Sequence, residues 1–248
     1  MNTTKQLQEL LSTMRRAIST HNMIQDGDRV AVGLSGGKDS LVLLECLATY
    51  QKFSPQKFDL IAVTVDGAMG QKFDRLKRFC KKLGVTYYIE PSQIGPIVFE
   101  TRKEKNPCSL CAKLRRGILN SALNKLGYNK LALAHHVDDM AETFFLSLLY
   151  EGRLNTFSPV SYMSRSDITV IRSMILTEEK DIVSYAKSAR LPILKNPCPV
   201  NHKTRREDMK NLIKRFDKEI IGGRINILGA LTNPERTNLW KLPNQKDN

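Results

Sequence analysis

Long apolar runs are missing from this chain of 248 residues. No run approaches the roughly 18 apolar residues that a membrane-spanning helix requires, so we expect no membrane segment. Residues 1–24 also lack the continuous apolar core of a secretory signal peptide. The five cysteines are too few for a disulfide framework in a chain of this length, which favours a reducing compartment. We therefore predict a cytoplasmic protein.

Acidic residues are also scarce: 25 Asp and Glu stand against 39 Lys and Arg, which gives a formal net charge of +14. The whole excess lies in residues 71–82 and 101–116, each with six basic residues and one acidic, and in residues 201–248, with eleven and six. A solvated helix face would explain one such segment. Three of them favour binding to a polyanion, because Lys and Arg neutralise phosphates in non-specific nucleic-acid binding.

Predicted strands and helices alternate over the first two thirds of the chain. Apolar segments at 29–34, 59–65, 85–89 and 129–135 are typical of buried strands, and helical periodicity marks 7–18, 41–50, 71–83, 109–126 and 140–150. Beyond residue 154 the pattern weakens to a short strand at 168–171 and helices at 178–189 and 205–221. This order predicts a doubly wound parallel α/β sheet, whose ligands bind at the carboxyl ends of the strands.

The expected organisation has three parts. Residues 1–28 form an N-terminal helix, residues 29–200 form the α/β domain with its cysteines, and residues 201–248 form a small basic helical extension. We expect a loose tail from residue 233.

A glycine turn follows the first predicted strand and reads Gly33-Leu34-Ser35-Gly36-Gly37-Lys38-Asp39-Ser40. Such a turn before a helix offers free backbone N–H groups to an anion. A Walker A loop is excluded, because this loop is one residue too short and an aspartate follows the lysine. A nucleophile elbow, Gly-x-Ser-x-Gly, is matched literally, but that motif follows several strands and an upstream oxyanion loop. Here only a helix precedes the turn.

Carboxylates follow two further predicted strands. Asp66 ends the second strand, and His135, His136, Asp138 and Asp139 follow the fourth. Vicinal carboxylates at a strand end can hold Mg²⁺ on phosphates, and the alternative role for Asp138 and Asp139 is helix capping. We expect His136 to be packed in the interior.

The cysteines suggest an inorganic centre. Cys108 and Cys111 have Cys-x-x-Cys spacing at the start of a predicted helix, and Cys198 repeats the Asn-Pro-Cys context of Cys108. With His202 these residues would make a structural Cys₃His zinc site; without it, three thiolates suit a [4Fe–4S] cluster with one open iron. Spacing alone leaves both alternatives open.

The segment Ser35 to Ser40 resembles the PP-loop of the ATP pyrophosphatases, which adenylate a substrate and release pyrophosphate. Asp66 and the His-x-x-Asp-Asp segment at 135–139 extend the resemblance. It implies an adenine nucleotide alpha hydrolase-like fold and ATP bound with Mg²⁺. The implied ATP-binding residues are Gly33, Ser35, Gly36, Gly37, Lys38, Asp39, Ser40, Asp66, His135 and Asp139.

Residues 108–119, together with the late Cys198, resemble the tRNA 2-thiocytidine synthetase group, and the likeness covers residues 23–216. In that group three cysteines hold a [4Fe–4S] cluster, ATP activates a base carbonyl, and sulfur is delivered through the free iron. The resemblance implies that Cys108, Cys111 and Cys198 bind the cluster. It also implies catalytic roles for Arg115, Asp138 and Cys198.

The implied function is an ATP-dependent tRNA sulfurtransferase that adenylates the C2 carbonyl of a pyrimidine and replaces its oxygen with sulfur. The favoured pyrimidine is cytidine, which would give 2-thiocytidine. Its partners would be tRNA and a sulfur donor, either a cysteine desulfurase or free sulfide, with no membrane; a homodimer stays open. Two alternatives remain: a PP-loop ligase that uses an amine nucleophile, and a zinc-stabilised RNA-binding module without catalysis.

Overall fold

The computed structural model describes residues 2–102, 107–199, 205–233, 235 and 238. The chain divides into two compact units, and each is considered by itself. The first consists of residues 1–138 and 157–202, and the second of residues 139–156 and 203–248. The predicted boundaries at residues 28 and 200 stay predictions.

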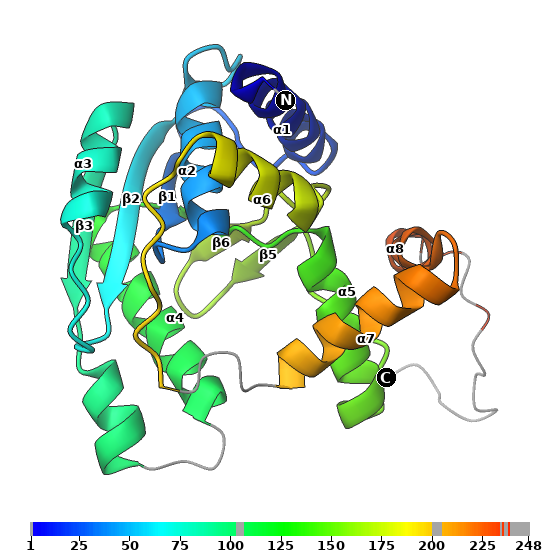
Figure 1. Cartoon of the computed structure of the whole chain (residues 1–248). Coiled ribbons are helices and arrows are strands. Elements are labelled where there is room, and N and C mark those ends of the chain that lie inside the picture. The colour runs from blue at the N-terminus through cyan, green and yellow to red at the C-terminus, as the bar shows by residue number, and fades with distance from the viewer. Residues whose placement is uncertain (1, 103–106, 200–204, 234, 236–237, 239–248) are drawn as a thin grey trace. The chain divides into compact units, whose positions relative to one another are not determined.

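The first unit is built on one six-stranded sheet (Figure 1). Its strands are β1 (Arg29–Gly33), β2 (Asp59–Asp66), β3 (Thr86–Pro91), β4 (Lys130–Ala132), β5 (Val160–Met163) and β6 (Ile168–Ile171), in the spatial order β3-β2-β1-β4-β6-β5. Every pairing is parallel except that of β5 with β6. The strand order reverses between β1 and β4, so the carboxyl ends of these two strands flank the crevice in which such sheets bind ligands.

Helices cover both faces of this sheet. The helical elements of the first unit are α1 (Thr3–Thr20), α2 (Lys38–Gln51), α3 (Asp74–Leu83), the π-helical turn η1 (Pro96–Thr101), α4 (Pro107–Leu126) and α6 (Glu179–Ser188). On one face α2 is largely buried, with Leu41, Leu43 and Leu47 fully buried, because it packs on the sheet and also against α1 and α6. On the other face Leu119 and Leu123 of α4 pack in one apolar cluster with β1 and β2. Both faces of the sheet are therefore covered and removed from solvent, which agrees with the unbroken apolar sequences of its strands.

The second unit is helical. It contains most of α5 (Val137–Leu146), the π-helical turn η2 (Ser147–Glu151), α7 (Arg205–Glu219) and α8 (Gly223–Thr232). Its core joins Ala141 and Phe145 of α5 to Met209 and Ile213 of α7. The rings of Phe145 and Phe216 stack at a centroid distance of 5.8 Å.

The predicted elements agree with this architecture, and the parallel α/β sheet is confirmed. Two details differ. The sequence did not indicate β5, an antiparallel edge strand whose Tyr162 is 65% exposed, because such a strand has no buried face to give a pattern. The predicted helix 140–150 begins earlier, at Val137, and its last turn widens into η2. The tail beyond residue 238 and His202 lie outside the described residues. None of the helices in the described part of the chain has the length and hydrophobicity of a membrane span.

Candidate functional site

The glycine turn runs from the carboxyl end of β1 to the first residue of α2. Gly36 has φ +82°, a left-handed conformation that favours glycine, and Gly37 is the N-cap of α2. Because Gly37 has no side chain, the first N–H groups of α2 are left for a ligand. The turn therefore has the geometry of an anion site at a helix N-terminus.

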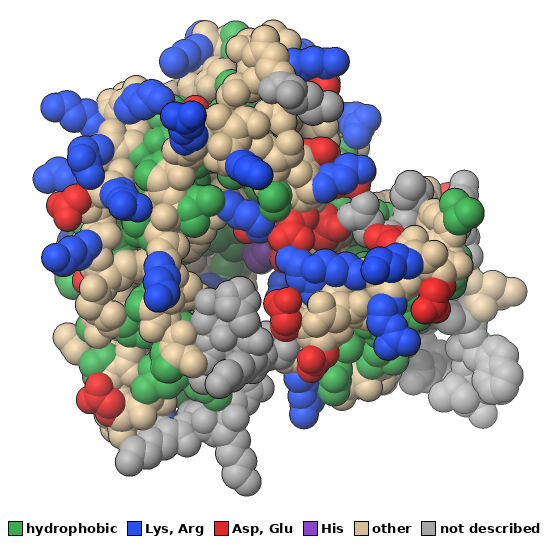
Figure 2. Space-filling model, in the orientation of Figure 1, with side chains coloured by type: hydrophobic (Ala, Val, Ile, Leu, Met, Phe, Trp, Pro, Cys, Tyr) green, Lys and Arg blue, Asp and Glu red, His purple; other side chains and the backbone are tan. Residues whose placement is uncertain are grey.

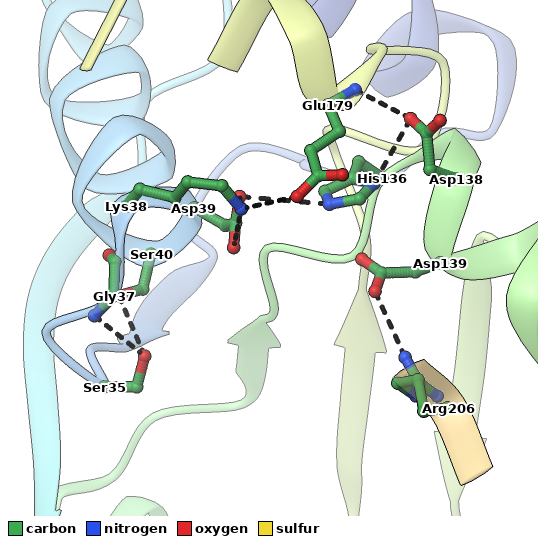
Figure 3. Close-up of polar contacts among 10 residues, drawn as sticks. All are labelled: Ser35, Gly37, Lys38, Asp39, Ser40, His136, Asp138, Asp139, Glu179 and Arg206. Carbon is green, nitrogen blue, oxygen red and sulfur yellow. Dashed lines mark hydrogen bonds and ion pairs between the residues drawn. The ribbon is translucent and has the colours of Figure 1, made fainter. Parts of the chain in front are cut away.

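Hydroxyl groups hold this turn in shape. The N–H of Gly37 donates to Ser35 Oγ at 3.3 Å, and Ser40 Oγ donates to the Gly37 carbonyl at 3.0 Å. The two serine oxygens lie 3.1 Å apart (Figure 3). These bonds fix the loop before any ligand binds, which lowers the ordering cost of binding.

Lys38 sits between two carboxylates. Its Nζ lies 2.7 Å from Asp39 Oδ1 and 3.0 Å from Glu179 Oε1, the latter on α6 (Figure 3). Burial alone would lower the pKa of Lys38, but Asp39 and Glu179 outweigh it and raise the pKa above its ordinary value. Lys38 therefore stays positively charged beside the turn.

Asp138 belongs to the same unit as the glycine turn. Its Oδ2 accepts the N–H of Glu179 at 2.7 Å, so it caps the N-terminus of α6. The same oxygen lies 3.6 Å from His136 Nδ1, and His136 Nε2 lies 3.8 Å from Asp39 Oδ1 (Figure 3). His136 is 4% exposed and is thus packed, as expected. It links Asp39 to Asp138.

Asp139 follows Asp138 in the sequence but belongs to the second unit. Its Oδ1 lies 3.1 Å from Arg206 Nη1 on α7. The same guanidinium group donates to Thr143 Oγ1 at 3.2 Å and lies 3.7 Å from Glu142 Oε2. The contacts of Asp139 within its own unit thus attach α7 to α5.

The side chain of His135 is positioned by Arg172 and Phe157. Its Nδ1 accepts a hydrogen bond from Arg172 Nε at 3.1 Å, and its ring lies 4.8 Å from the ring of Phe157. Burial first, and the charge of Arg116 second, lower the pKa of Arg172 to about 10, so Arg172 stays charged at neutral pH. Because Nδ1 accepts, a neutral His135 carries its proton on Nε2.

The end of β2 brings in Asp66 and Arg115. Asp66 Oδ1 accepts the N–H of Ala68 at 3.0 Å and thereby shapes the turn after β2. A guanidinium nitrogen of Arg115, on α4, lies 3.8 Å from the position that a Cβ on Gly67 would occupy. Arg115 therefore reaches from α4 to the carboxyl end of β2.

The three predicted cluster ligands come from two segments. Cys108 is exposed and Cys111 half-buried in the first turns of α4, and Cys198 is half-buried in a loop. Burial raises the pKa of the Cys108 thiol, and the neighbouring thiols of Cys198 and Cys111 raise it further. Cys198 therefore belongs to the electrostatic surroundings of Cys108 at the start of α4. Across the described residues, however, no three His, Cys, Asp or Glu side chains are already arranged as a metal site.

An extended segment, residues 191–199, connects the cysteines to the glycine turn. Its Leu194 N–H donates to the Gly36 carbonyl at 2.9 Å, and its Lys195 carbonyl accepts from Gln71 Nε2 at 3.3 Å. Figure 1 shows this segment running from α6 across the sheet edge toward α4. Cys198 lies near the end of this segment, and its N–H donates to Asn196 Oδ1 at 3.0 Å.

Three of these contacts were not found from the sequence: those of Leu194 with Gly36, of Arg172 with His135, and of Glu179 with Lys38. Leu194 and Arg172 carry no local motif, and only folding brings them to the site. Glu179 stands near the start of the predicted helix 178–189, and nothing in that pattern indicated a contact with Lys38.

Comparisons with known proteins agree with this geometry. A family model described as the PP-loop domain matches residues 2–215. The tRNA-cytidine(32) 2-sulfurtransferase of Geobacter sulfurreducens is 35% identical over 242 residues, which cover 96% of this chain and 94% of that protein. The enzyme of the same name from Ralstonia pickettii is 39% identical and covers 90% of this chain and 72% of its own length.

A solved structure is also similar: the U34-tRNA thiolase NcsA from Methanococcus maripaludis with its [4Fe–4S] cluster. It superimposes with a TM-score of 0.73 at 25% identity, covering 92% of this chain and 79% of that one. The chain therefore belongs to the PP-loop family, in the group of the tRNA-cytidine(32) 2-sulfurtransferases.

Proposed function

We propose that this chain is an ATP-dependent tRNA sulfurtransferase that replaces the C2 oxygen of a cytidine with sulfur. One observation carries the proposal: segment 191–199 bonds to the PP-loop at Gly36 and brings Cys198 within electrostatic range of Cys108. Nucleotide activation and thiolate chemistry thus share one edge of the sheet. The names of the similar proteins supply the substrate class.

ATP would bind with its phosphates at the N-terminus of α2. The free N–H groups after Gly37 and the hydroxyls of Ser35 and Ser40 are donors for phosphate oxygens, and Lys38 supplies a positive charge. The C2 oxygen of the base attacks the α-phosphate, and the bond to pyrophosphate breaks. The base then carries AMP on its former carbonyl oxygen.

Mg²⁺ would neutralise the phosphates during this step, and Asp138 is the residue of the PP-loop unit that we propose to hold it. One oxygen of Asp138 is engaged with Glu179, which orients the carboxylate. Mg²⁺ binds through one or two carboxylates together with substrate phosphates and waters. A preformed cage of three protein ligands is therefore not required at this site.

The chemistry of the donor set also fits an iron–sulfur cluster. Three cysteines from two segments meet around Cys108: Cys111 lies one turn further along α4, and the thiol of Cys198 acts on Cys108 from the loop 191–199. Held by Cys108, Cys111 and Cys198, a [4Fe–4S] cluster would supply one iron open to an outside sulfur ligand. His202, the fourth ligand of the zinc alternative, lies outside the described residues.

Sulfur replaces oxygen without a change of oxidation state. A sulfide attacks C2, the C2–O bond breaks, and AMP leaves with the electron pair. Arg115 reaches the end of β2 and is a cation suited to the phosphate of the departing AMP. His135, as an Nε2 donor, would orient the base or the nucleotide. The sulfur donor, a cysteine desulfurase or free sulfide, the cytoplasmic location and a homodimer stay predictions.

The test uses anaerobically prepared protein with ATP, Mg²⁺, sulfide and unmodified tRNA. We expect about four irons per chain, pyrophosphate release that depends on tRNA, and 2-thiocytidine among the digested nucleosides. Cys198→Ala should abolish 2-thiocytidine and leave ATP affinity unchanged. Undiminished thiolation by Cys198→Ala would contradict the proposed role of the cysteines.

The same experiment separates the alternatives. A PP-loop ligase would keep its activity after loss of Cys108 and would incorporate an amine rather than sulfur. A zinc-stabilised RNA-binding module would contain zinc and would release no pyrophosphate with any RNA.

A further inference from the structure

A basic groove lies beside the PP-loop unit's apolar core, away from the residues that would contact ATP. It has a volume of about 660 Å³ and runs between α3, the end of α6 and Glu45 of α2. Its cations are Arg75, Arg78 and Lys82 of α3 and Arg190 after α6, and its one carboxylate is Glu45. We call it the α3 groove. Figure 2 shows Lys and Arg side chains gathered on the face that α3 forms.

The cations are available to a partner. Arg75, Arg78 and Arg190 are exposed, and none of them takes part in a salt bridge within the described residues. The positions 75, 78 and 82 lie on one face of the helix, so their charges line the same wall. Arg190 provides a charge from another element.

Helix stability does not explain this arrangement. Arg75 stands in the first turn of α3, where a cation opposes the helix dipole by ~0.3–1 kcal/mol. Arg190 has φ +51°, a strained conformation for a residue other than glycine. Arg75 and Arg190 therefore occupy positions at which the fold by itself disfavours them.

The groove has the composition of a phosphate-binding surface rather than a protein-binding one. Its aromatic residues, Phe79 and Tyr185, are 6% and 2% exposed, so no aromatic anchor is offered to a protein partner. Four cations against one carboxylate suit a chain of phosphates, which arginines bind with paired donors.

One wall of the groove leads along the chain to the candidate active site. Leu191 and Pro192 form part of its wall, and Leu194, which bonds to the PP-loop at Gly36, follows two residues later. A strand held in the groove would therefore pass the edge of the site.

We propose that the α3 groove binds the sugar–phosphate backbone of the RNA substrate, outside the nucleotide that is modified. This inference rests on the proposed function for the identity of the RNA. It assigns the binding to one face of α3 and to Arg190, not to the basic segment 71–82 as a whole.

The chain offers a charge-matched control on the same helix. Lys77 and Lys81 are exposed, do not line the groove and carry the same total charge as Arg75 and Arg78. We compare the Arg75→Gln/Arg78→Gln variant with the Lys77→Gln/Lys81→Gln variant, and add Arg190→Gln. The assays are binding of labelled tRNA at several salt concentrations, ATP affinity, iron content and thiolation kinetics.

We expect the arginine pair to raise the Kd for tRNA about tenfold and to reduce the slope of log K against log salt by roughly 1.5–2. KM for tRNA should rise with kcat and ATP affinity unchanged, and Arg190→Gln should act in the same direction. The lysine pair should change the Kd less than about threefold. Thermal unfolding of each variant verifies that it is folded.

If both double variants lost the same tRNA affinity, the RNA would be held by diffuse attraction to the whole helix, and the inference would be overturned. An arginine-pair variant with unchanged tRNA affinity would overturn it as well. Weakened binding of an acidic sulfur-donor protein, with tRNA binding intact, would assign the groove to a protein and overturn it as well. Failure of the proposed function would give a different result: the wild-type protein would form no thiolated nucleoside with any tRNA. The tRNA-binding assay of the variants would still test the groove in that case.

Discussion

One added methyl group at Gly36 tests the connection between the PP-loop and segment 191–199. The φ of +82° there costs a residue other than glycine ~1–2 kcal/mol. An ideal Cβ at Gly36 would also lie 3.0 Å from Cγ and Cδ1 of Leu194, closer than ordinary contacts. Crowding of this kind costs ~1–3 kcal/mol. The Gly36→Ala variant should therefore lose about 2–5 kcal/mol in total, unless Leu194 moves away.

The loss should appear both in stability and in ligand binding. We expect a lower free energy of unfolding in urea and, because the loop is distorted, an ATP affinity reduced at least about tenfold, which corresponds to ~1.4 kcal/mol. Adding Leu194→Ala to Gly36→Ala should restore the part of the loss due to crowding and leave the part due to φ.

Gly84→Ala is the matched control. Gly84 has φ +73°, and no heavy atom lies within 4 Å of its ideal Cβ, so this substitution has the backbone penalty alone, ~1–2 kcal/mol. ATP affinity should be unchanged. The reasoning is refuted if Gly36→Ala and Gly84→Ala lose the same stability, or if Leu194→Ala rescues nothing.

Three further substitutions probe other contacts. Arg172→Met removes the donor to His135 Nδ1 and should lower the free energy of unfolding by ~1–3 kcal/mol, with a changed tautomer signal for His135 in ¹⁵N NMR; an unchanged spectrum would contradict this. Burial raises the pKa of Glu45 above 4.5, so the folded state holds more protons than the unfolded one, and the free energy of unfolding falls as the pH rises from 4.5 through the folded-state pKa. Glu45→Gln should remove that fall in urea titrations at several pH values, and an identical pH profile would count against it. Phe216→Ala removes the ring stacked on Phe145 and should cost ~2–3 kcal/mol; hydrogen exchange should accelerate in α7 and not in the sheet, and uniform acceleration would show that the units unfold together.

Most of the fold was predictable because its signals are local. The strands β1 and β2 are buried on both faces, so they read as unbroken apolar runs, and α3 ends at Gly84, a left-handed residue that the sequence marks directly. The strand β5 could not be predicted, because a four-residue edge strand is specified by its partner β6 and not by its own pattern.

The candidate site was predictable only where a motif is contiguous. The sequence Ser35 to Ser40 specifies the turn by itself, since its serines and glycines bond to one another. The environment of Asp138 was not predictable, because its partner, the N–H of Glu179, is 41 residues away and is set by the packing of α6. Cysteine spacing gave Cys108 and Cys111 as a pair, but only the path of segment 191–199 brings Cys198 near them.

That path depends on backbone groups more than on side chains. The Leu194 N–H binds the Gly36 carbonyl, and the Lys195 carbonyl accepts from Gln71, so neither bond requires a particular side chain at 194 or 195. Side-chain identity matters at two other points: Gly36, which must accept a left-handed φ beneath Leu194, and Asn196, whose side chain holds the N–H of Cys198. The register between the nucleotide loop and the third cysteine is therefore fixed by chain geometry over the residues 194–198. An insertion in that stretch should be less tolerable than a substitution within it, because it would shift Cys198 along the chain while the bond at Gly36 stayed in place.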